Sequence, residues 1–228
     1  MARDTLTKEQ IVRTAIELLD AEGLDGLNMR SLGKRLDAAA TAMYWHVKNK
    51  DNLVRLATDE VWGEIELPDI DFLEWRTAAE AVAYGMYEMI MRHPWIVQAL
   101  SGYLLYGPNK SRHDDLVLDL FERAGFDEIE ADQAAASIFM FVLGNAVGAA
   151  ANVSLNRKLS RDGANAEARM NEAMAEATAV ARQFPRLRTR IERAAATDYN
   201  AAPDRSFEFG LTILLDGFSD RIEDLKSL

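Results

Sequence analysis

Apolar residues recur at helical spacing along almost the whole chain. Near the N-terminus, Ile11, Ala15, Leu18 and Leu19 fall at i, i+4, i+7 and i+8, which places them on one face of a helix. Alanine, leucine, glutamate, arginine and methionine are frequent, and alternating β-branched segments are scarce. The pattern predicts an all-α fold that begins with a helix over residues 7–22.

Polar residues and a glycine mark the ends of the first predicted helices. Thr7 and Gln10 have the spacing of a capping box at the start of the first helix. Gly23 is typical of the residue that follows a helix end. Asn28 is expected to cap a short second helix that ends at Leu36.

A second short helix follows at once. Residues 37–39 form a tight connection to a helix over residues 40–46, and Asn49 caps a longer helix over residues 50–65. Two short helices joined by about three residues are typical of a helix-turn-helix unit. In such a unit the second helix lies in the major groove of DNA.

Proline, glycine and polar clusters divide the rest of the chain. We expect helices over residues 72–93, 95–105, 110–124, 129–156, 170–196 and 206–225, with an interruption before Pro185, a polar mobile loop over residues 157–168 and a break over residues 201–204. The break at residues 67–71 suggests three parts. These are a helix-turn-helix domain over residues 1–49, a connecting helix over residues 50–67 and a larger helical body over residues 68–228.

Charge is unevenly distributed along the chain. The formal net charge is −11, yet residues 1–57 hold nine Lys/Arg and eight Asp/Glu. Residues 28–50 hold five basic residues and one acidic residue. An acidic body would repel DNA and keep it at the basic end, although acidic surfaces also favour solubility in general. A phosphate backbone is therefore the expected partner of the basic segment.

Composition excludes several classes of protein. There is no cysteine, so disulfides, thiolate metal sites and cysteine nucleophiles are excluded. The N-terminus lacks the apolar stretch of a signal peptide. The longest small-apolar stretch, residues 134–153, contains Ser137, Asn145 and Asn152, and we interpret it as a buried helix and not a membrane span. We expect a cytoplasmic protein that does not enter a membrane.

The candidate chemistry does not indicate an enzyme or a metal site. The three histidines, His46, His93 and His113, lie far apart, and no Glu-x-x-His pair, Gly-x-Ser-x-Gly elbow or phosphate-binding loop is present. Asp114 and Asp115 are consecutive, which indicates a solvated helix face. We expect no catalytic residues, no cofactor and no metal.

The segment around residues 40–50 carries the candidate DNA contacts. Thr41 can bond a base edge or touch a thymine methyl group, and Tyr44 can donate to a phosphate. Lys50 adds charge at a helix start, where free N–H groups also bind phosphate. The alternative is that Tyr44 and Trp45 are core aromatics of a small three-helix unit. The full candidate set is Arg30, Ala40, Thr41, Ala42, Tyr44, Trp45, His46, Lys48 and Lys50.

Residues 7–60 resemble the DNA-binding region of the TetR (tetracycline repressor) family of regulators. The segment Tyr44-Trp45-His46-Val47-Lys48-Asn49-Lys50 is similar to the end of the recognition helix and the start of the next helix in the tetracycline repressors. Residues 207–218 are similar to the last helix of that subgroup, whereas the middle of the chain matches in pattern and length only.

The resemblance implies a homodimeric repressor that leaves a palindromic double-stranded DNA operator when a small hydrophobic or aromatic effector binds. It implies that residues 1–49 are the DNA-binding domain and residues 68–228 the effector-binding and dimerisation domain. The family's dimer interface pairs two long helices from each subunit, which here would be those over residues 129–156 and 206–225. The corresponding interface candidates are Phe141, Gly144, Gly148, Phe207, Gly210, Leu214 and Phe218. The candidate pocket residues are Trp75, Met86, Met89, Trp95, Tyr103, Phe139 and Asn145.

Two departures from the tetracycline repressors change what we expect. Ala40 and Ala42 stand among positions that include polar base-contacting side chains in that subgroup, so the operator should differ. Residues 96–102 lack the histidine with which the subgroup holds drug-bound magnesium, so magnesium–tetracycline is not the expected effector. The two alanines leave a second hypothesis open, an all-α ligand-binding or scaffold protein that has lost specific DNA binding.

Overall fold

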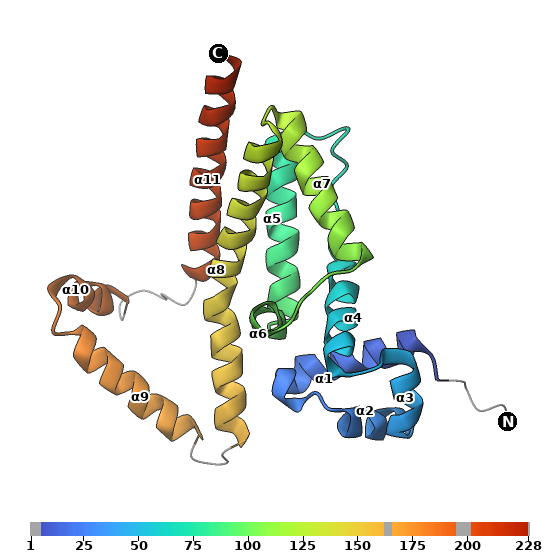
Figure 1. Ribbon diagram of the computed structural model, residues 1–228. Helices are drawn as coiled ribbons and strands as arrows, with labels where there is room; N and C mark the ends of the chain where they lie inside the picture. The colour runs from blue at the N-terminus through green and yellow to red at the C-terminus, as the bar shows by residue number, and fades with distance from the viewer. Residues whose placement is uncertain (1–5, 162–165, 195–201, 228) are drawn as a thin grey trace. The chain divides into compact units, whose positions relative to one another are not determined.

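The computed structural model describes residues 6–161, 166–194 and 202–227, which form α-helices and no strands (Figure 1). The helices are α1 Lys8–Gly26, α2 Met29–Leu36, α3 Ala40–Val47, α4 Lys50–Trp62, α5 Trp75–Arg92, α6 Trp95–Gly102, α7 Pro108–Ala124, α8 Glu128–Arg161, α9 Ala166–Ala181, α10 Pro185–Ala194 and α11 Ala202–Lys226. The all-α prediction is confirmed.

The chain divides into two compact units. One comprises Met1–Ala150 and Leu214–Leu228, and the other comprises Ala151–Ile213. The first unit contains α1 to α7, most of α8 and the second half of α11. The second contains α9, α10 and the adjoining ends of α8 and α11. The candidate DNA-binding residues and the cavity described below lie in the first unit.

The predicted helix starts in the N-terminal region are confirmed by their caps. Thr7 accepts a hydrogen bond from the Gln10 backbone N–H (3.2 Å), and the Gln10 side chain accepts one from the Thr7 N–H (2.9 Å). Asn28 and Asn49 cap α2 and α4 through their side-chain oxygens. The positive φ of 71° at Gly23 interrupts α1 one residue after its predicted end.

The first helices enclose a small apolar core, which fixes the helix-turn-helix geometry. Leu18, Leu32, Met43 and Leu53 are fully buried, one from each of α1 to α4. At the turn, a Cβ on Gly33 would lie 2.7 Å from the carbonyl oxygen of Ala38, so glycine permits the close approach of α2 to the turn. The core holds α3 with one face turned inward and the other outward.

The body packs around α5, α7 and α8. The buried stripe of α8 is spaced at three or four residues and comprises Ala131, Ala134, Ile138, Val142, Ala146 and Ala150. From α11, Phe218 lies against Phe121 and Phe126, with ring centroids 5.6 and 5.9 Å apart. Arg221 of α11 forms an ion pair with Glu130 of α8. These contacts fix the second half of α11 on the first unit.

Several predicted boundaries are wrong. The helix expected over residues 50–65 ends at Trp62, the next one begins at Trp75 and not at residue 72, and α6 ends at Gly102 and not at residue 105. Part of the loop predicted over residues 157–168 is helical, because α8 continues to Arg161 and α9 begins at Ala166. Residues 162–165 lie outside the described residues.

The break predicted over residues 201–204 is also wrong from residue 202 onward, and residue 201 is not described. Helix α11 begins at Ala202, so Pro203 lies in its first turn and Ser206 lies inside the helix and does not cap it. A proline is tolerated in a first turn because the N–H groups there have no partner within the helix. The interruption before Pro185 is confirmed, since α9 ends at Ala181 and α10 begins at Pro185.

Candidate DNA-binding surface, head–body junction and pocket

Helix α3 separates its side chains cleanly between core and solvent. Met43 and Val47, four residues apart, are fully buried. Tyr44 and Trp45 are 46% and 89% exposed, and Thr41 is exposed as well. The alternative in which the two aromatics form the core is therefore wrong, because Met43 and Val47 fill that place. The outward face offers the hydroxyl groups of Thr41 and Tyr44 and the aromatic side chains of Tyr44 and Trp45 to a partner.

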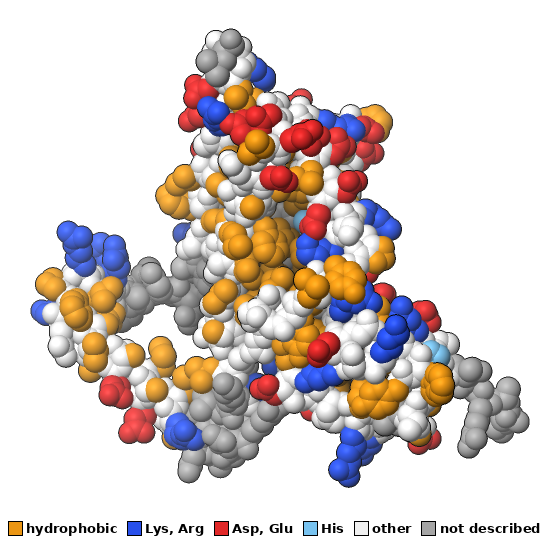
Figure 2. Space-filling view, in the orientation of Figure 1, with side chains coloured by type: hydrophobic (Ala, Val, Ile, Leu, Met, Phe, Trp, Pro, Cys, Tyr) orange, Lys and Arg blue, Asp and Glu red, His pale blue; other side chains and the backbone are white. Residues whose placement is uncertain are grey.

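Basic residues flank this face at helix ends. Arg30 is exposed in the first turn of α2, and Lys48 is exposed just after α3. Lys50 is half-buried, and its ammonium group donates a hydrogen bond to the carbonyl oxygen of Leu24 (2.9 Å). An ammonium group has three donors, so this bond leaves two for a phosphate. We call α1 to α4 the head and the remaining helices of the first unit the body. Figure 2 shows Lys and Arg side chains spread over the head, whereas acidic side chains gather around the far end of the body.

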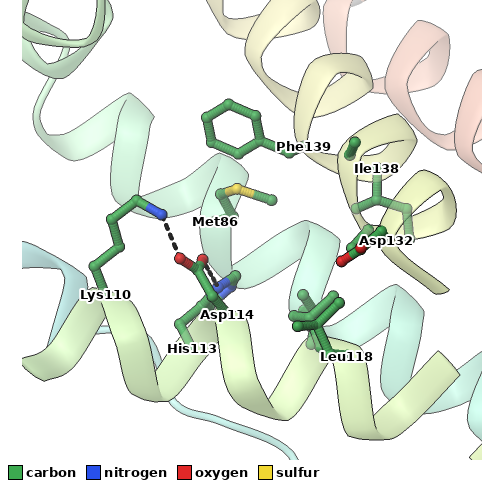
Figure 3. A pocket seen from close by; sticks show the side chains of 12 residues that line it. Met86, Lys110, His113, Asp114, Leu118, Asp132, Ile138 and Phe139 are labelled. Carbon is green, nitrogen blue, oxygen red and sulfur yellow. Dashed lines mark hydrogen bonds and ion pairs between the residues drawn. The ribbon is translucent and has the colours of Figure 1, made fainter. Parts of the chain in front are cut away.

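A cavity of about 250 Å³ lies among α5, α7 and α8 (Figure 3). Its lining comprises Val82 and Met86 of α5, Lys110, His113, Asp114, Val117 and Leu118 of α7, and Asp132, Ala135, Ala136, Ile138 and Phe139 of α8. Of the candidate pocket residues, Met86 and Phe139 line it. The lining is apolar apart from one cation, two carboxylates and one imidazole.

The other five candidates lie elsewhere. Met89 is fully buried in the core, and the indole N–H of Trp95 donates to Asp20 (2.7 Å). Tyr103 lines a separate cavity of about 350 Å³ beside α4. The side chain of Asn145 donates to the carbonyl oxygen of Phe141 within α8 (2.8 Å). Trp75 begins α5 and is half-buried.

Sequence reasoning missed the contribution of α7 to the cavity. His113, Val117, Phe121 and Ala124 are all buried and fall at i, i+4, i+8 and i+11, so the histidine continues an apolar stripe. The position of His113 on this apolar stripe was the feature of the sequence that could have indicated it. Asp114, which we expected on a solvated face, is half-exposed and lines the cavity.

His113 connects the cavity wall to α4. Its side chain is 5% exposed, and its ring meets Trp62 edge to face with centroids 4.8 Å apart. Its Nδ1 atom lies 3.5 Å from Asp114 Oδ1. Neither ring nitrogen of His113 has a hydrogen-bond partner in the described part of the chain, and neither has the indole nitrogen of Trp62.

Asp114 is the ionised neighbour of this histidine. Burial opposes its ionisation, but its contacts with His113 and Lys110 outweigh that effect and hold the pKa of Asp114 below the usual value. Lys110 forms an ion pair with Asp114 and also lies over the Trp62 ring, 5.2 Å from its centroid. The carboxylate, the ammonium group and the imidazole thus form one cluster at the cavity wall.

Asp59 joins the connecting helix to the pocket helix. Its carboxylate accepts hydrogen bonds from the backbone N–H groups of Asn109 and Lys110 (both 3.0 Å), and its carbonyl accepts one from the Asn109 side chain (3.0 Å). Gly107 at the start of α7 has no capping side chain, so Asp59 supplies the cap from α4. Helix α4 is thereby fixed to the first turn of α7, which also carries Lys110 of the cavity wall.

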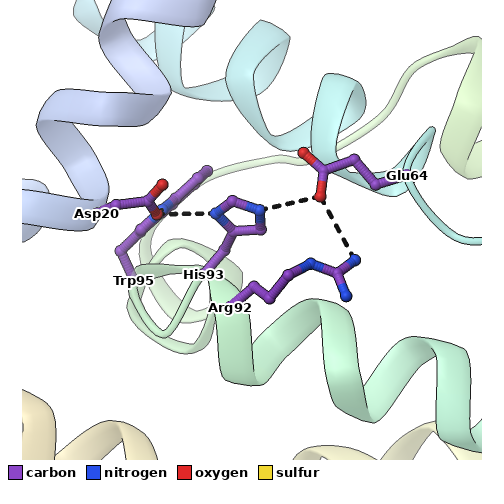
Figure 4. Close-up of polar contacts among 5 residues, drawn as sticks. All are labelled: Asp20, Glu64, Arg92, His93 and Trp95. Atoms are coloured by element: carbon purple, nitrogen blue, oxygen red, sulfur yellow. Dashed lines mark hydrogen bonds and ion pairs between the residues drawn. The ribbon is translucent and has the colours of Figure 1, made fainter.

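A second junction centres on His93, the C-cap residue that follows α5 (Figure 4). Its Nδ1 atom lies 2.8 Å from Asp20 Oδ1 of α1, and its Nε2 atom lies 3.1 Å from Glu64 Oε2, just beyond α4. Arg92 pairs with the same Glu64 oxygen (3.4 Å). Burial disfavours the charged imidazole, but the hydrogen bonds and charges of Asp20 and Glu64 outweigh it and raise the pKa of His93 above 6.5.

This junction should make stability depend on pH. The folded-state pKa is raised, so the stabilisation is complete below about pH 6.5 and is lost as the pH rises through the folded-state pKa. His93→Gln should lower the free energy of unfolding at pH 6 by about 1 kcal/mol, a modest value because both carboxylates are partly exposed. Urea unfolding of both proteins from pH 5.5 to 9 tests this. A difference that stays constant or grows with pH would contradict it.

The two parts of the chain match known families of bacterial regulators. Residues 11–57 match the family described as bacterial regulatory proteins, tetR family, and residues 67–222 match the tetracyclin repressor-like C-terminal domain. The chain belongs to the TetR family. Membership makes it a DNA-binding transcriptional regulator and not an enzyme. The resemblance seen in the sequence at Tyr44–Lys50 is therefore confirmed as a family relationship.

Individual TetR relatives span most of the chain. A transcriptional repressor of Streptomyces coeruleorubidus, DrrR1, is 29% identical over 94% of this chain and 78% of its own length. The class C tetracycline repressor of Escherichia coli is 27% identical over 98% of both chains. The crystal structure of ActR from Streptomyces coelicolor bound to actinorhodin has a TM-score of 0.71 and 27% identity, covering 95% of this chain and 96% of ActR.

Among the described residues, no group of three His, Asp or Glu side chains could hold a metal ion.

Proposed function

We propose that the protein is a homodimeric repressor that binds a palindromic operator and is released by a small hydrophobic or aromatic effector. This proposal rests on the direct connection between the exposed face of α3 and the cavity. Helix α4 follows α3 after two residues and is tied through Asp59 to α7, which forms one wall of the cavity. A ligand that moves α7 can therefore move α3.

Helix α8 carries an exposed apolar stripe, which supports a dimer. Met140 and Val147 are 64% and 45% exposed, and a Cβ on Gly144 or Gly148 would meet nothing within 4 Å. An 18-residue window within Glu128–Leu155 has a mean hydropathy of 1.8 and is only 28% buried, which by length and composition alone would suit a membrane span. In a DNA-binding regulator, pairing with a second copy of the chain also explains this exposed apolar surface. We therefore propose that this face of α8 forms a dimer interface and does not enter a membrane.

Helix α11 contributes a second stripe of the same kind. Phe209 and Ile213 are 70% and 54% exposed, and Gly217 continues the same face with open space beyond it. Not all of the predicted interface residues are equally available. Phe207 is buried within its own chain, and Phe218 packs on Phe121 and Phe126, whereas Phe141, Gly210 and Leu214 are half-buried.

Relatives support the effector part of the proposal. ActR has been crystallised with actinorhodin and with (S)-DNPA, and DrrR1 is a transcriptional repressor. The cavity here is lined mainly by aliphatic side chains, methionine and phenylalanine, which suits a small apolar ligand. A regulator of this kind, with DNA as its target, belongs in the cytoplasm.

Two heads must reach successive major grooves at once, about 34–36 Å apart. A change of a few Å in their separation abolishes simultaneous contact. The effector achieves this only if it binds the released conformation more tightly than the DNA-bound one. The link from the cavity through α7 and Asp59 to α4 provides a path by which a movement of α7 on ligand binding reaches α3.

Operator binding tests the proposal directly. A DNA sequence is first selected from a random library with the wild-type protein, and its affinity is then measured by fluorescence anisotropy over a range of salt concentrations. Lys48→Ala should weaken binding to all sequences and reduce the salt slope by about 1. Thr41→Val should change the difference in binding free energy between alternative bases at one operator position by about 1–3 kcal/mol. It should change the dependence of affinity on salt concentration very little. Failure to select any sequence would favour the alternative, a ligand-binding protein that has lost specific DNA binding.

A further inference from the structure

Two walls of the cavity carry accessible carboxylates. Asp114 of α7 and Asp132 of α8 both line it, and both residues are exposed to solvent in the single chain. A bound molecule can therefore reach them, unlike the buried ring nitrogens of His113. Figure 3 shows Asp132 on the other side of Met86 from Asp114. The two acids thus belong to different parts of one cavity.

Only one of these two acids has a cation beside it. The ammonium group of Lys110 pairs with Asp114, whereas Asp132 forms no ion pair or hydrogen bond within the described ranges of the chain. Arg123 of α7 and Arg221 of α11 are each bound by other carboxylates. With histidine neutral, one lysine and two aspartates give the lining a formal charge of −1. The unbalanced charge is that of Asp132.

An apolar surface adjoins this unbalanced acid on the same face of α8. Asp132, Ala135, Ala136 and Phe139 all line the cavity and fall at i, i+3, i+4 and i+7. Seven residues of helix rise by about 10 Å, which a fused two-ring compound with a one-carbon arm can span. A ring system that lies against Phe139 and Met86 can therefore place a substituent beside Asp132.

We propose that the effector is a cationic amphiphile, with a ring system in the apolar part of the cavity and a protonated amine paired with Asp132. This inference rests on the proposed function and adds the ligand's charge and the residue that selects it. Water screens an exposed ion pair, so apolar contact supplies most of the affinity and the charge supplies selectivity. An anionic ligand of the same shape would repel Asp132 and would find Lys110 already paired.

Three naphthalene derivatives of similar size test the proposal. These are 2-naphthylmethylamine, which is cationic at pH 7, 2-naphthylmethanol, which is neutral, and 2-naphthoate, which is anionic. Isothermal titration calorimetry at pH 7 measures their binding to the wild type, to Asp132→Asn and to Asp132→Lys. The matched control is Asp115→Asn, which removes the same charge from an exposed position of α7 outside the cavity lining.

At about 50 mM salt the wild type should bind the amine about 5-fold more tightly than the alcohol, and naphthoate more weakly than the alcohol. The preference for the amine should fall to about 1-fold in Asp132→Asn, reverse in favour of naphthoate in Asp132→Lys and persist in Asp115→Asn. Equal affinity of the wild type for amine and alcohol, no binding of any of the three, or an amine preference that survives in Asp132→Lys would overturn the inference. The first two outcomes need no variant, so they decide the matter even if a variant fails to fold.

DNA release separates this inference from the proposed function. With the selected operator bound to wild-type protein, 2-naphthylmethylamine should release DNA at about 5-fold lower concentration than 2-naphthylmethanol, and this difference should disappear in Asp132→Asn. Release by both compounds at the same concentration in the wild type would overturn the role of Asp132 and leave the proposed function standing. Absence of any specific protein–DNA complex would overturn the proposed function itself.

Discussion

Asp59→Ala should lower the free energy of unfolding by about 3 kcal/mol. Asp59 is 8% exposed, and its carboxylate accepts hydrogen bonds from the N–H groups of Asn109 and Lys110 at the start of α7. Alanine would leave two backbone donors without partners and remove a negative charge from the positive end of a helix dipole. Urea unfolding at pH 7 measures the change, and Glu60→Ala, which removes an exposed carboxylate from the neighbouring position, is the matched control with an expected change within about 0.5 kcal/mol.

The same substitution should separate ligand binding from DNA release. The cavity wall remains in Asp59→Ala, but the tie between α4 and the first turn of α7 is lost. Ligand affinity should therefore change little, while the ligand concentration needed to release DNA should rise. An Asp59→Ala protein as stable as the Glu60→Ala protein would show that the carboxylate does not cap α7.

Phe209→Glu should convert the proposed dimer to monomers at micromolar concentration. Phe209 is 70% exposed in a single chain, so the monomer tolerates the carboxylate. In a two-fold interface each substitution occurs twice, and burying an unpaired charge costs about 3–5 kcal/mol. The dimer dissociation constant should rise at least about 1,000-fold. Sedimentation equilibrium measures it.

A matched control for this change is Leu104→Glu. Leu104 is 83% exposed in the segment between α6 and α7 and lies on neither stripe. This protein should remain a dimer and bind operator DNA like the wild type. If Phe209→Glu also remains a dimer, the α11 stripe is not part of the interface, and α8 has to be tested separately through Met140→Glu.

The head was more predictable from the sequence than the body because its signals are local. Thr7, Asn28 and Asn49 each bond a backbone N–H three residues away, so each helix start can be predicted from a few neighbouring letters. Whether Tyr44 and Trp45 are buried or exposed could not be predicted from the sequence in this way. Aromatic residues suit both a core and a binding surface, and only the packing of Met43 and Val47 decides between the two.

The cavity was less predictable because its walls come from segments far apart in the chain. Met86 and Phe139 line it, yet Met89, one turn from Met86 on the same helix, is part of the core. Neither composition nor spacing distinguishes these two methionines. His113 was missed because its chemistry depends on Trp62 and the cavity wall, which the chain brings together only in three dimensions.

The exposed apolar face of α8 has a consequence for protein dosage. If only paired chains hold DNA, the amount of active repressor varies with the square of chain concentration whenever that concentration lies below the dimer dissociation constant. Small changes in expression then become larger changes in operator occupancy. If the proposed dimer forms, a newly made single chain also exposes a hydrophobic helix face until it pairs with a second copy. Weak expression should therefore favour clearance by chaperones and proteases over DNA binding, which gives the regulated genes a threshold.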